Sequence, residues 1–526
     1  MSVPHHPATG SRHAGHARTH GHLQTSARAV GLGLAGGLCV GLAGAPSELF
    51  AVAFLGPALL LAAIEPEPRM TVGPRNGALA GLAFGIACNA LTMPWVAGLL
   101  SSFAGIPAPL AWAVSAMLWT VQALPWALAG WGAAAWTQGG ATGWIVLPGW
   151  IVLAGSVTPM LFPWRLGISQ MPGVLFVQSA ELGGPPLLDL LMALGACAAL
   201  QALRERRART AAVATAAIVA PLLYGALRLP TVRAERIASP ALRVGVVQPS
   251  IGVEARSDPM LRESHLARHR TMTTELEAAG AALVLWPESA YPFPLDRSEA
   301  SDSLQPHRRV LHQGVRGPVL FGALTSDATH RYNSVVALDA SGRFTGRYDK
   351  AHLLAFGEYT PLHEWLGPLR RVVPRGLDAG GGARTLDAAG VRIGVLDCYE
   401  DLLVDHARRT AALDPDFLAN FTNDAWFGAT AAPHLHHMLA RLRAVETRRD
   451  MVRAVNSGVS ALVLATGEDE HRTAPFERTS FIANVRRLSG TTPWVRWGDL
   501  TTPFVAFGLL LDAVRRRRQS LPGPPD

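Results

Sequence analysis

The sequence predicts a membrane α-helical bundle of about eight spans that carries an external α/β domain. Three observations indicate this: hydrophobic residues make up 49% of the chain, charged residues only 16%, and a stretch poor in charge, 29–203, precedes a polar one, 242–497. Such a composition is typical of membrane proteins. The net charge of +8 is explained by arginines that flank the apolar segments, so we expect no nucleic-acid partner.

Residues 1–28 form the first segment. They contain many histidines together with arginine, glycine, serine and threonine, and they show no apolar periodicity. A metal-binding tail is one interpretation of this composition, but a disordered basic leader fits it better.

The membrane domain is expected at 29–229, because about 20 apolar residues cross a bilayer core. Its seven predicted spans lie near 29–46, 49–64, 76–100, 107–135, 143–162, 184–203 and 210–227. An eighth span is predicted at 498–514, before a cytoplasmic tail at 515–526. Arginine clusters at 204–209 and 515–518 follow even-numbered spans. Since cytoplasmic loops are rich in arginine, we expect both clusters inside and residues 242–497 outside.

Residues 242–497 are expected to form one α/β domain. Apolar, β-branched runs predict strands, at 242–247, 282–286, 319–323, 334–338, 391–396, 417–421 and 460–465. A helix is predicted after Pro433. Its apolar face would carry Leu435, Met438, Leu439, Leu442 and Val445, and its other face Arg441, Arg448 and Arg449.

Three residues stand out in this domain, each just after an apolar run of β type. Cys398 is the one cysteine of four outside the apolar segments, and Lys350 is the only lysine in the chain. Glu288 is the third. A thiol nucleophile with Glu288 as its base and Lys350 as the cation for an oxyanion would use all three. A lone Cys398 could instead be a buried structural thiol, and its acidic neighbours would raise its pKa.

Two clusters could suggest metal ligands. His434, His436 and His437 open the predicted helix, but no cysteine is near them in sequence, which favours polar packing at the helix end. Asp397, Glu400 and Asp401 surround Cys398, which favours an effect on the pKa of the thiol. We therefore expect neither a metal nor another cofactor.

Five motifs carry a resemblance to known proteins. Trp286-Pro287-Glu288, the Tyr-Asp-Lys-Ala-His-Leu run at 348–353 and Asp397-Cys398-Tyr399-Glu400 resemble the signature blocks of the nitrilase superfamily. The resemblance implies an αββα sandwich with a Glu-Lys-Cys triad. Two further runs narrow the resemblance to one family within this superfamily. They are Phe-Gly-Glu-Tyr-Thr-Pro at 356–361 and Asn-Asp-Ala-Trp-Phe-Gly at 423–428, with 440–446 beyond it. With spans on both sides, the chain resembles bacterial apolipoprotein N-acyltransferases.

The resemblance implies a ping-pong reaction. A phospholipid, typically phosphatidylethanolamine, acylates Cys398, and the chain then passes to the α-amine of a diacylglyceryl-cysteine on an apolipoprotein. Glu288 would be the base, and Lys350 and the backbone N–H of Tyr399 would stabilise the oxyanion. Glu358 would support the triad, and Tyr399 and Glu400 would shape the surroundings of the thiol. The family also implies the bacterial inner membrane, with the catalytic domain on the periplasmic side.

Two other functions remain open from the sequence. A membrane-anchored amidase or nitrile hydrolase would use the same triad with water as acceptor, but the preceding spans would then have no purpose. A domain that only binds lipoproteins would leave the single lysine unexplained. The sequence also departs from the family pattern at Gln248-Pro249-Ser250-Ile251, where the family usually has Gln-x-Asn and soon a tryptophan. The family's lipid contacts at this loop are therefore not assigned to residues of this chain.

Overall fold

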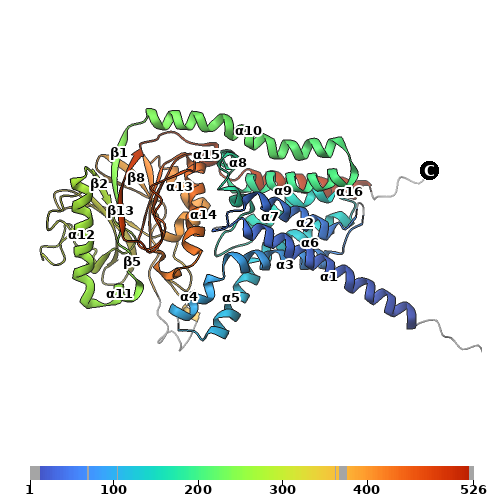
Figure 1. Cartoon of the computed structure of the whole chain (residues 1–526), viewed down its shortest axis with the longest axis horizontal. Helices are drawn as coiled ribbons and strands as arrows, with labels where there is room; N and C mark the ends of the chain where they lie inside the picture. The colour runs from blue at the N-terminus through green and yellow to red at the C-terminus, as the bar shows by residue number, and fades with distance from the viewer. Residues whose placement is uncertain are drawn as a thin grey trace, which may run out of the picture.

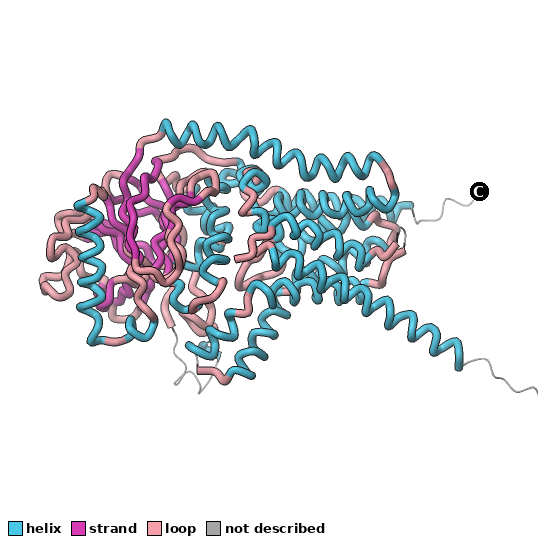
Figure 2. The backbone as a smooth tube through the Cα atoms, viewed as in Figure 1, coloured by secondary structure: helices cyan, strands magenta, loops and turns pink. Residues whose placement is uncertain are grey.

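The computed structural model describes residues 12–519 except 45, 68–69, 104, 362 and 366–375. A helical part and an α/β part lie end to end (Figure 1). The strands are confined to one end of the molecule, and helices make up most of the other (Figure 2). The described fold therefore has the two parts that the sequence predicts.

The helical part is built from the N-terminal half of the chain and the last helix. Its elements are α1 (Arg12–Leu42), η1 (Phe50–Phe54), α2 (Leu55–Ile64), α3 (Pro74–Thr92), α4 (Trp95–Phe103), α5 (Ala108–Gln122), α6 (Leu124–Gln138), α7 (Gly143–Val157), η2 (Leu166–Gln170), α8 (Val174–Val177), α9 (Ala180–Glu205), α10 (Ala208–Ala238) and α16 (Thr501–Gln519). The predicted disordered leader is wrong from Arg12 onward, because α1 begins there. No proline interrupts residues 12–28, so the helix extends toward the N-terminus from its apolar segment. Residues 1–11 lie outside the described residues.

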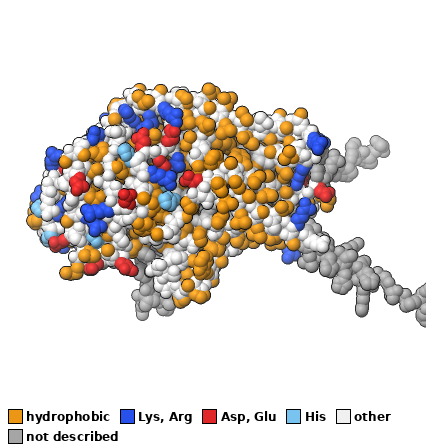
Figure 3. All heavy atoms as spheres, in the orientation of Figure 1, with side chains coloured by type: hydrophobic (Ala, Val, Ile, Leu, Met, Phe, Trp, Pro, Cys, Tyr) orange, Lys and Arg blue, Asp and Glu red, His pale blue; other side chains and the backbone are white. Residues whose placement is uncertain are grey.

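Three helical segments of the described chain are long and apolar enough to cross a membrane: Ala108–Gln138, α9 and α10. The bent pair α3 and α4 can add a fourth. Shorter apolar helices lie at Ser26–Leu42, Phe50–Ile64 and Gly143–Val157. Hydrophobic side chains form a broad band over the helical part, with charged side chains on the α/β part and at the opposite end (Figure 3). The molecule thus has a membrane-type surface, and the count of about eight spans stays a prediction.

The segment predicted as one span at 76–100 is broken. Helices α3 and α4 meet at an angle of 58°. Pro94 lies in the break, where a proline lacks the N–H that a continuous helix requires. The bend turns α4 toward the α/β part, and the ring centroids of Trp95 and Phe427 are 4.7 Å apart.

The α/β part contains two sheets. The first has the order β13-β1-β2-β4-β5-β6, with β3 paired to β4, and the second has the order β12-β11-β10-β9-β8-β7. The strands are β1 (Ala241–Gln248), β2 (Leu283–Leu285), β3 (Tyr291–Asp296), β4 (Val319–Ser326), β5 (Arg331–Leu338), β6 (Phe344–Asp349), β7 (Thr385–Ala388), β8 (Val391–Asp397), β9 (Phe417–Thr422), β10 (Met451–Val455), β11 (Ala461–Val463), β12 (Asp469–Glu470) and β13 (Thr479–Arg486). Each predicted strand run overlaps one of these.

The core between the sheets follows the period of two in the strands. In β9, Phe417, Ala419 and Phe421 face the other sheet, whereas Leu418 faces the helices behind. Outer layers come from α12 (Arg262–Ala278) on the first sheet and from α13 (Val404–Ala411) and α14 (Ala432–Thr447) on the second. Short elements complete this part: α11 (Val253–Ser257), η3 (Pro259–Leu261), η5 (Cys398–Leu402), η6 (Asp424–Phe427) and α15 (Pro493–Trp497). The predicted αββα sandwich is confirmed.

Helix α14 joins the sandwich to the helical bundle (Figure 1). It begins at Ala432, so it starts slightly before the predicted position after Pro433 and includes this proline in its first turn. The predicted apolar face, from Leu435 to Val445, belongs to the same hydrophobic core as the bundle helices. One layer of the sandwich therefore rests directly on the membrane part.

Buried ion pairs reinforce this junction. The carboxylate of Glu181, at the start of α9, accepts hydrogen bonds from Arg448 Nε at 2.7 Å and from Arg228 Nε at 2.9 Å. Arg448 follows α14 and also bonds to Gln178. Three elements, α9, α10 and α14, thus meet at one carboxylate.

Candidate active site

The three residues singled out in the sequence lie at strand ends. Glu288 follows β2, Lys350 directly follows β6, and Cys398 directly follows β8. The first two belong to one sheet and the third to the other. Glu288 and Lys350 lie close enough to Cys398 to change the pKa of its thiol. The sandwich therefore brings these strand ends to one site.

Lys350 lies at the centre of this site and is only 1% exposed. Its Nζ is 3.3 Å from Glu288 Oε1 and 2.8 Å from Glu358 Oε2. Burial lowers the pKa of Lys350, but these carboxylates outweigh burial and raise it well above its usual value. Lys350 is therefore an ammonium at neutral pH, and Glu358 is paired with it, while the role of Glu358 in the reaction stays a prediction.

Asn333 is a member of the site that the sequence analysis missed. Its Nδ2 donates to Glu288 Oε1 at 2.6 Å and to Glu358 Oε1 at 3.2 Å. The side chain is buried on β5, one residue before the predicted strand 334–338. A polar residue at the start of a buried strand was the available signal, because buried amides require partners. Asn333 holds the two carboxylates that flank Lys350.

Cys398 begins the η5 turn with a φ of +49°. A non-glycine residue with this backbone conformation is strained, and such strain is found at functional sites. Burial raises the pKa of the Cys398 thiol, and the Glu288 carboxylate raises it further, while the Lys350 ammonium lowers it. The thiol therefore stays protonated at neutral pH until a base removes its proton.

Glu400 ties the lysine loop to the cysteine turn. It is fully buried, and its Oε1 accepts hydrogen bonds from the backbone N–H of Ala351 at 2.7 Å and of His352 at 3.0 Å. Its Oε2 accepts one from Tyr348 Oη at 2.6 Å and one from the N–H of Asp397 at 2.8 Å. The residues on either side of Lys350 and the residue before Cys398 are thus bonded to one carboxylate.

Tyr399 connects the cysteine turn to the membrane part. Its hydroxyl donates a hydrogen bond to the backbone oxygen of Leu161 at 2.6 Å, and its ring lies edge-on to Phe162. Leu161 and Phe162 belong to the loop between α7 and η2. The turn that carries Cys398 therefore contacts a loop of the helical bundle directly.

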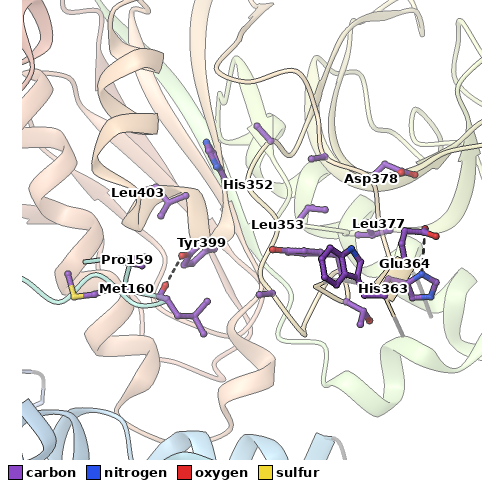
Figure 4. Close-up of a pocket in the computed structure, with 17 residues that line it drawn as sticks. Pro159, Met160, His352, Leu353, His363, Glu364, Leu377, Asp378, Tyr399 and Leu403 are labelled. Atoms are coloured by element: carbon purple, nitrogen blue, oxygen red, sulfur yellow. Dashed lines mark hydrogen bonds and ion pairs between the residues drawn. The ribbon is translucent and has the colours of Figure 1, made fainter. Parts of the chain in front are cut away.

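A cavity of about 890 Å³ opens beside Tyr399 (Figure 4). One wall comes from the bundle loop, the other from the loops after Lys350 and before β7. The lining residues are Pro159, Met160, Leu161, Ala351, His352, Leu353, Ala355, Tyr359, Thr360, His363, Glu364, Trp365, Leu377, Asp378, Ala379, Tyr399 and Leu403. Most of the lining is apolar, with polar groups at His363, Glu364 and Asp378. An acyl chain and a polar headgroup could both find partners here.

Several of the residues considered as metal ligands have other partners. His436 lies between Asp401 and Asp424, and His437 bonds to Asp469. Glu400 bonds to backbone groups and to Tyr348, as described above. Among the described ranges, no group of three or more histidine, cysteine, aspartate or glutamate side chains is arranged to hold a metal ion.

Comparison with known families gives two matches. Residues 36–198 match the apolipoprotein N-acyltransferase N-terminal domain, and residues 243–489 match the carbon-nitrogen hydrolase family. Among solved structures, an amidase of the nitrilase superfamily from Nesterenkonia AN1 is similar, at 15% identity and a TM-score of 0.36, over 48% of this chain and 93% of that one.

Curated relatives match most of the chain. An apolipoprotein N-acyltransferase from Azotobacter vinelandii is 31% identical over 94% of this chain and 96% of its own length. Those from Methylococcus capsulatus and Gloeobacter violaceus are 30% and 34% identical and cover 94% and 68% of this chain, and 97% and 68% of their own lengths. The amidase alternative has no better support. With both halves matched, the chain belongs to the apolipoprotein N-acyltransferase family of the nitrilase superfamily.

Proposed function

We propose that the chain transfers an acyl chain from a phospholipid, through a thioester on Cys398, to the α-amine of a diacylglyceryl-cysteine at an apolipoprotein N-terminus. The observation that carries this proposal is the buried ammonium of Lys350, held by Glu288 and Glu358 beside the Cys398 thiol. A large, mostly apolar cavity borders the same turn and the bundle loop. Such a site suits a reaction between two substrates anchored in lipid.

In the first half-reaction, Glu288 accepts the thiol proton while Sγ attacks the ester carbonyl carbon of the phospholipid. The oxyanion that forms receives the positive charge of Lys350 and a hydrogen bond from the backbone N–H of Tyr399. When this intermediate collapses, the C–O bond of the ester breaks. The leaving lysophospholipid oxygen takes the proton from Glu288, and the acyl chain remains on Cys398.

In the second half-reaction, the α-amine of the lipoprotein attacks the thioester. Glu288 accepts a proton from the amine and returns it to the departing thiolate of Cys398, so the enzyme regains its starting state. Glu358 and Asn333 keep Lys350 in place through both steps. The cavity must exclude water while the thioester waits, because hydrolysis would waste the acyl chain.

The donor headgroup and the location are part of the proposal. Phosphatidylethanolamine would place its ammonium near the acidic residues of the cavity, Glu364 and Asp378. Eight spans in the bacterial inner membrane, with the arginine clusters 204–209 and 515–518 in the cytoplasm, would put the sandwich on the periplasmic side. Both substrates would then reach the thiol from the outer leaflet.

The test uses purified protein with labelled phosphatidylethanolamine, with and without a diacylated lipopeptide. Without the lipopeptide, the peptide that contains Cys398 should gain the mass of one acyl group, removable by neutral hydroxylamine. With the lipopeptide, the label should move to its α-amine. Cys398→Ala should abolish both signals, whereas acylation of Cys39, Cys88 or Cys197 would contradict the assignment. Release of free fatty acid alone would indicate the hydrolase.

A further inference from the structure

A buried chain of charges lies behind the Cys398 turn. His436, on α14, is 7% exposed, and its Nδ1 is 2.9 Å from Asp424 Oδ1 while its Nε2 is 2.9 Å from Asp401 Oδ1. Asp401 lies in η5, three residues after Cys398, and its other oxygen bonds to Arg453 Nη1 on β10. Asp401 and Asp424 are both fully buried. Four elements therefore meet through alternating acidic and basic groups.

The geometry sets the charge of His436. Each ring nitrogen faces a carboxylate oxygen, and an imidazole can donate from both nitrogens only when it is protonated. Burial lowers the pKa of His436, but the two carboxylates offset this and raise it to about 9. At neutral pH the two aspartates of this row, Asp424 and Asp401, are thus negative, and His436 and Arg453 are positive.

This row of charged side chains extends both to Cys398 and to a contact between the sandwich and the helical bundle. The Asp424 carboxylate adds to the effect of burial and of Glu288 in raising the pKa of the Cys398 thiol. Asp424 also begins η6, whose Phe427 packs against Trp95 of the bundle and lies edge-on to the His436 ring. We therefore expect a change in the charge of His436, which pairs with Asp424, to change the pKa of the Cys398 thiol.

We propose that His436 is a positioning residue that fixes the Cys398 turn against the Asp424 turn and neutralises the Asp424 carboxylate. The proposal rests on the proposed function only in taking Cys398 as the nucleophile. It goes beyond the polar packing at a helix end that the sequence predicts for His434, His436 and His437.

The charged groups around this site define the test. Asp401 and Asp424 face His436 from η5 and η6, and Arg453 on β10 pairs with Asp401. Glu288 and Lys350 act on the thiol from the other sheet. If the imidazolium is replaced by a neutral amide, two buried carboxylates lose their shared cation. The negative charge near Cys398 then grows, and the pKa of the thiol rises.

The experiment measures alkylation of Cys398 by iodoacetamide against pH, with the modified peptide identified by mass spectrometry. His436→Gln should raise the apparent pKa of the thiol by about one unit and slow alkylation at pH 8 by about tenfold. Asp424→Asn should do the opposite, lowering the pKa and speeding alkylation, because it removes one of the negative charges. Damage to packing alone would not give opposite signs.

His437→Gln is the matched control. His437 is the next residue on the same helix and is also buried, but it bonds to Asp469 on β12, which β9, β10 and β11 separate from β8 and Cys398. Its variant should keep the wild-type alkylation profile. An unchanged thiol pKa in both His436→Gln and Asp424→Asn, or a fall in melting temperature with no change in the profile, would overturn the proposal. If His436→Gln does not fold, the faster alkylation of Asp424→Asn still decides. Since alkylation needs no lipid, failure of acyl transfer is a separate result.

Discussion

Lys350 is surrounded by more negative charge than it can neutralise alone. Glu288 and Glu358 both contact its Nζ, and Asn333 bridges the two carboxylates. In the proposed mechanism, Glu358 keeps the ammonium in place and Glu288 takes the thiol proton. These separate roles explain why one lysine lies between two glutamates.

Lys350→Arg should be nearly as inactive as Lys350→Ala. Arginine keeps the charge, but its planar fork is too broad for a pocket in which Nζ lies 2.8 Å and 3.3 Å from two carboxylates. We expect a loss of acyl transfer on the order of 10²-fold or more, the scale for removing an oxyanion donor. The measurement is transfer to a diacylated lipopeptide, normalised to folded protein by melting temperature. Activity within about threefold of wild type would show that the amine has only a structural role.

At the scale of elements, the junction between α9, α10 and α14 decides how the sandwich sits on the bundle. Its polar centre is Glu181, whose side chain is 4% exposed and bonds to Arg228 and Arg448. The Tyr224 hydroxyl also donates a hydrogen bond to Glu181 Oε1, at 2.6 Å. Removal of this carboxylate charge would leave two arginines without their shared partner in a buried place.

Glu181→Gln should destabilise the protein by about 3–5 kcal/mol, the usual cost of breaking a buried ion pair from one side. Glu235→Gln is the control, because Glu235 pairs with the same Arg228 but its side chain is 54% exposed. That control should cost less than about 1 kcal/mol. Thermal unfolding followed by tryptophan fluorescence compares the two variants. Equal melting temperatures would show that the junction does not depend on this charge.

The sequence predicted the elements whose pattern is local. The ends of β2 and β8 and the apolar face of α14 follow from periodicity within each segment. Six strands were not predicted, β3, β6, β7, β10, β12 and β13, because several are short or partly polar and are fixed by their neighbours. Strand β13, for example, pairs in antiparallel register with β1 from the far end of the domain. The contacts of Asn333 and His436 could not be predicted either, since they depend on residues from other elements.

At the scale of the whole molecule, the sandwich and the bundle share a surface. Tyr399 bonds to the Leu161 backbone, Trp95 packs on Phe427, and the apolar face of α14 lies in the core of the bundle. The cavity has walls from both parts. The catalytic turn is therefore held at the boundary between the membrane part and the α/β part.

The proposed topology can be tested with two single cysteines, each in a background in which Cys39, Cys88, Cys197 and Cys398 are replaced by alanine. Ala328 is exposed in a turn after β4, and Ala208 is exposed at the start of α10, next to the arginine cluster. Ala328→Cys should react with a membrane-impermeant maleimide in intact spheroplasts, whereas Ala208→Cys should react only after lysis. The reverse pattern would invert the topology.

Because the only lysine is buried, the rate of its chemical modification can report how often the site around it opens. Reagents that acylate amines need an uncharged, exposed amine, and Lys350 in the folded protein is neither, being 1% exposed and held as an ammonium. Modification of its peptide should therefore proceed only as fast as the site transiently unfolds. Mass spectrometry of that peptide over time would give the opening rate of the catalytic centre, and bound lipid substrate should slow it.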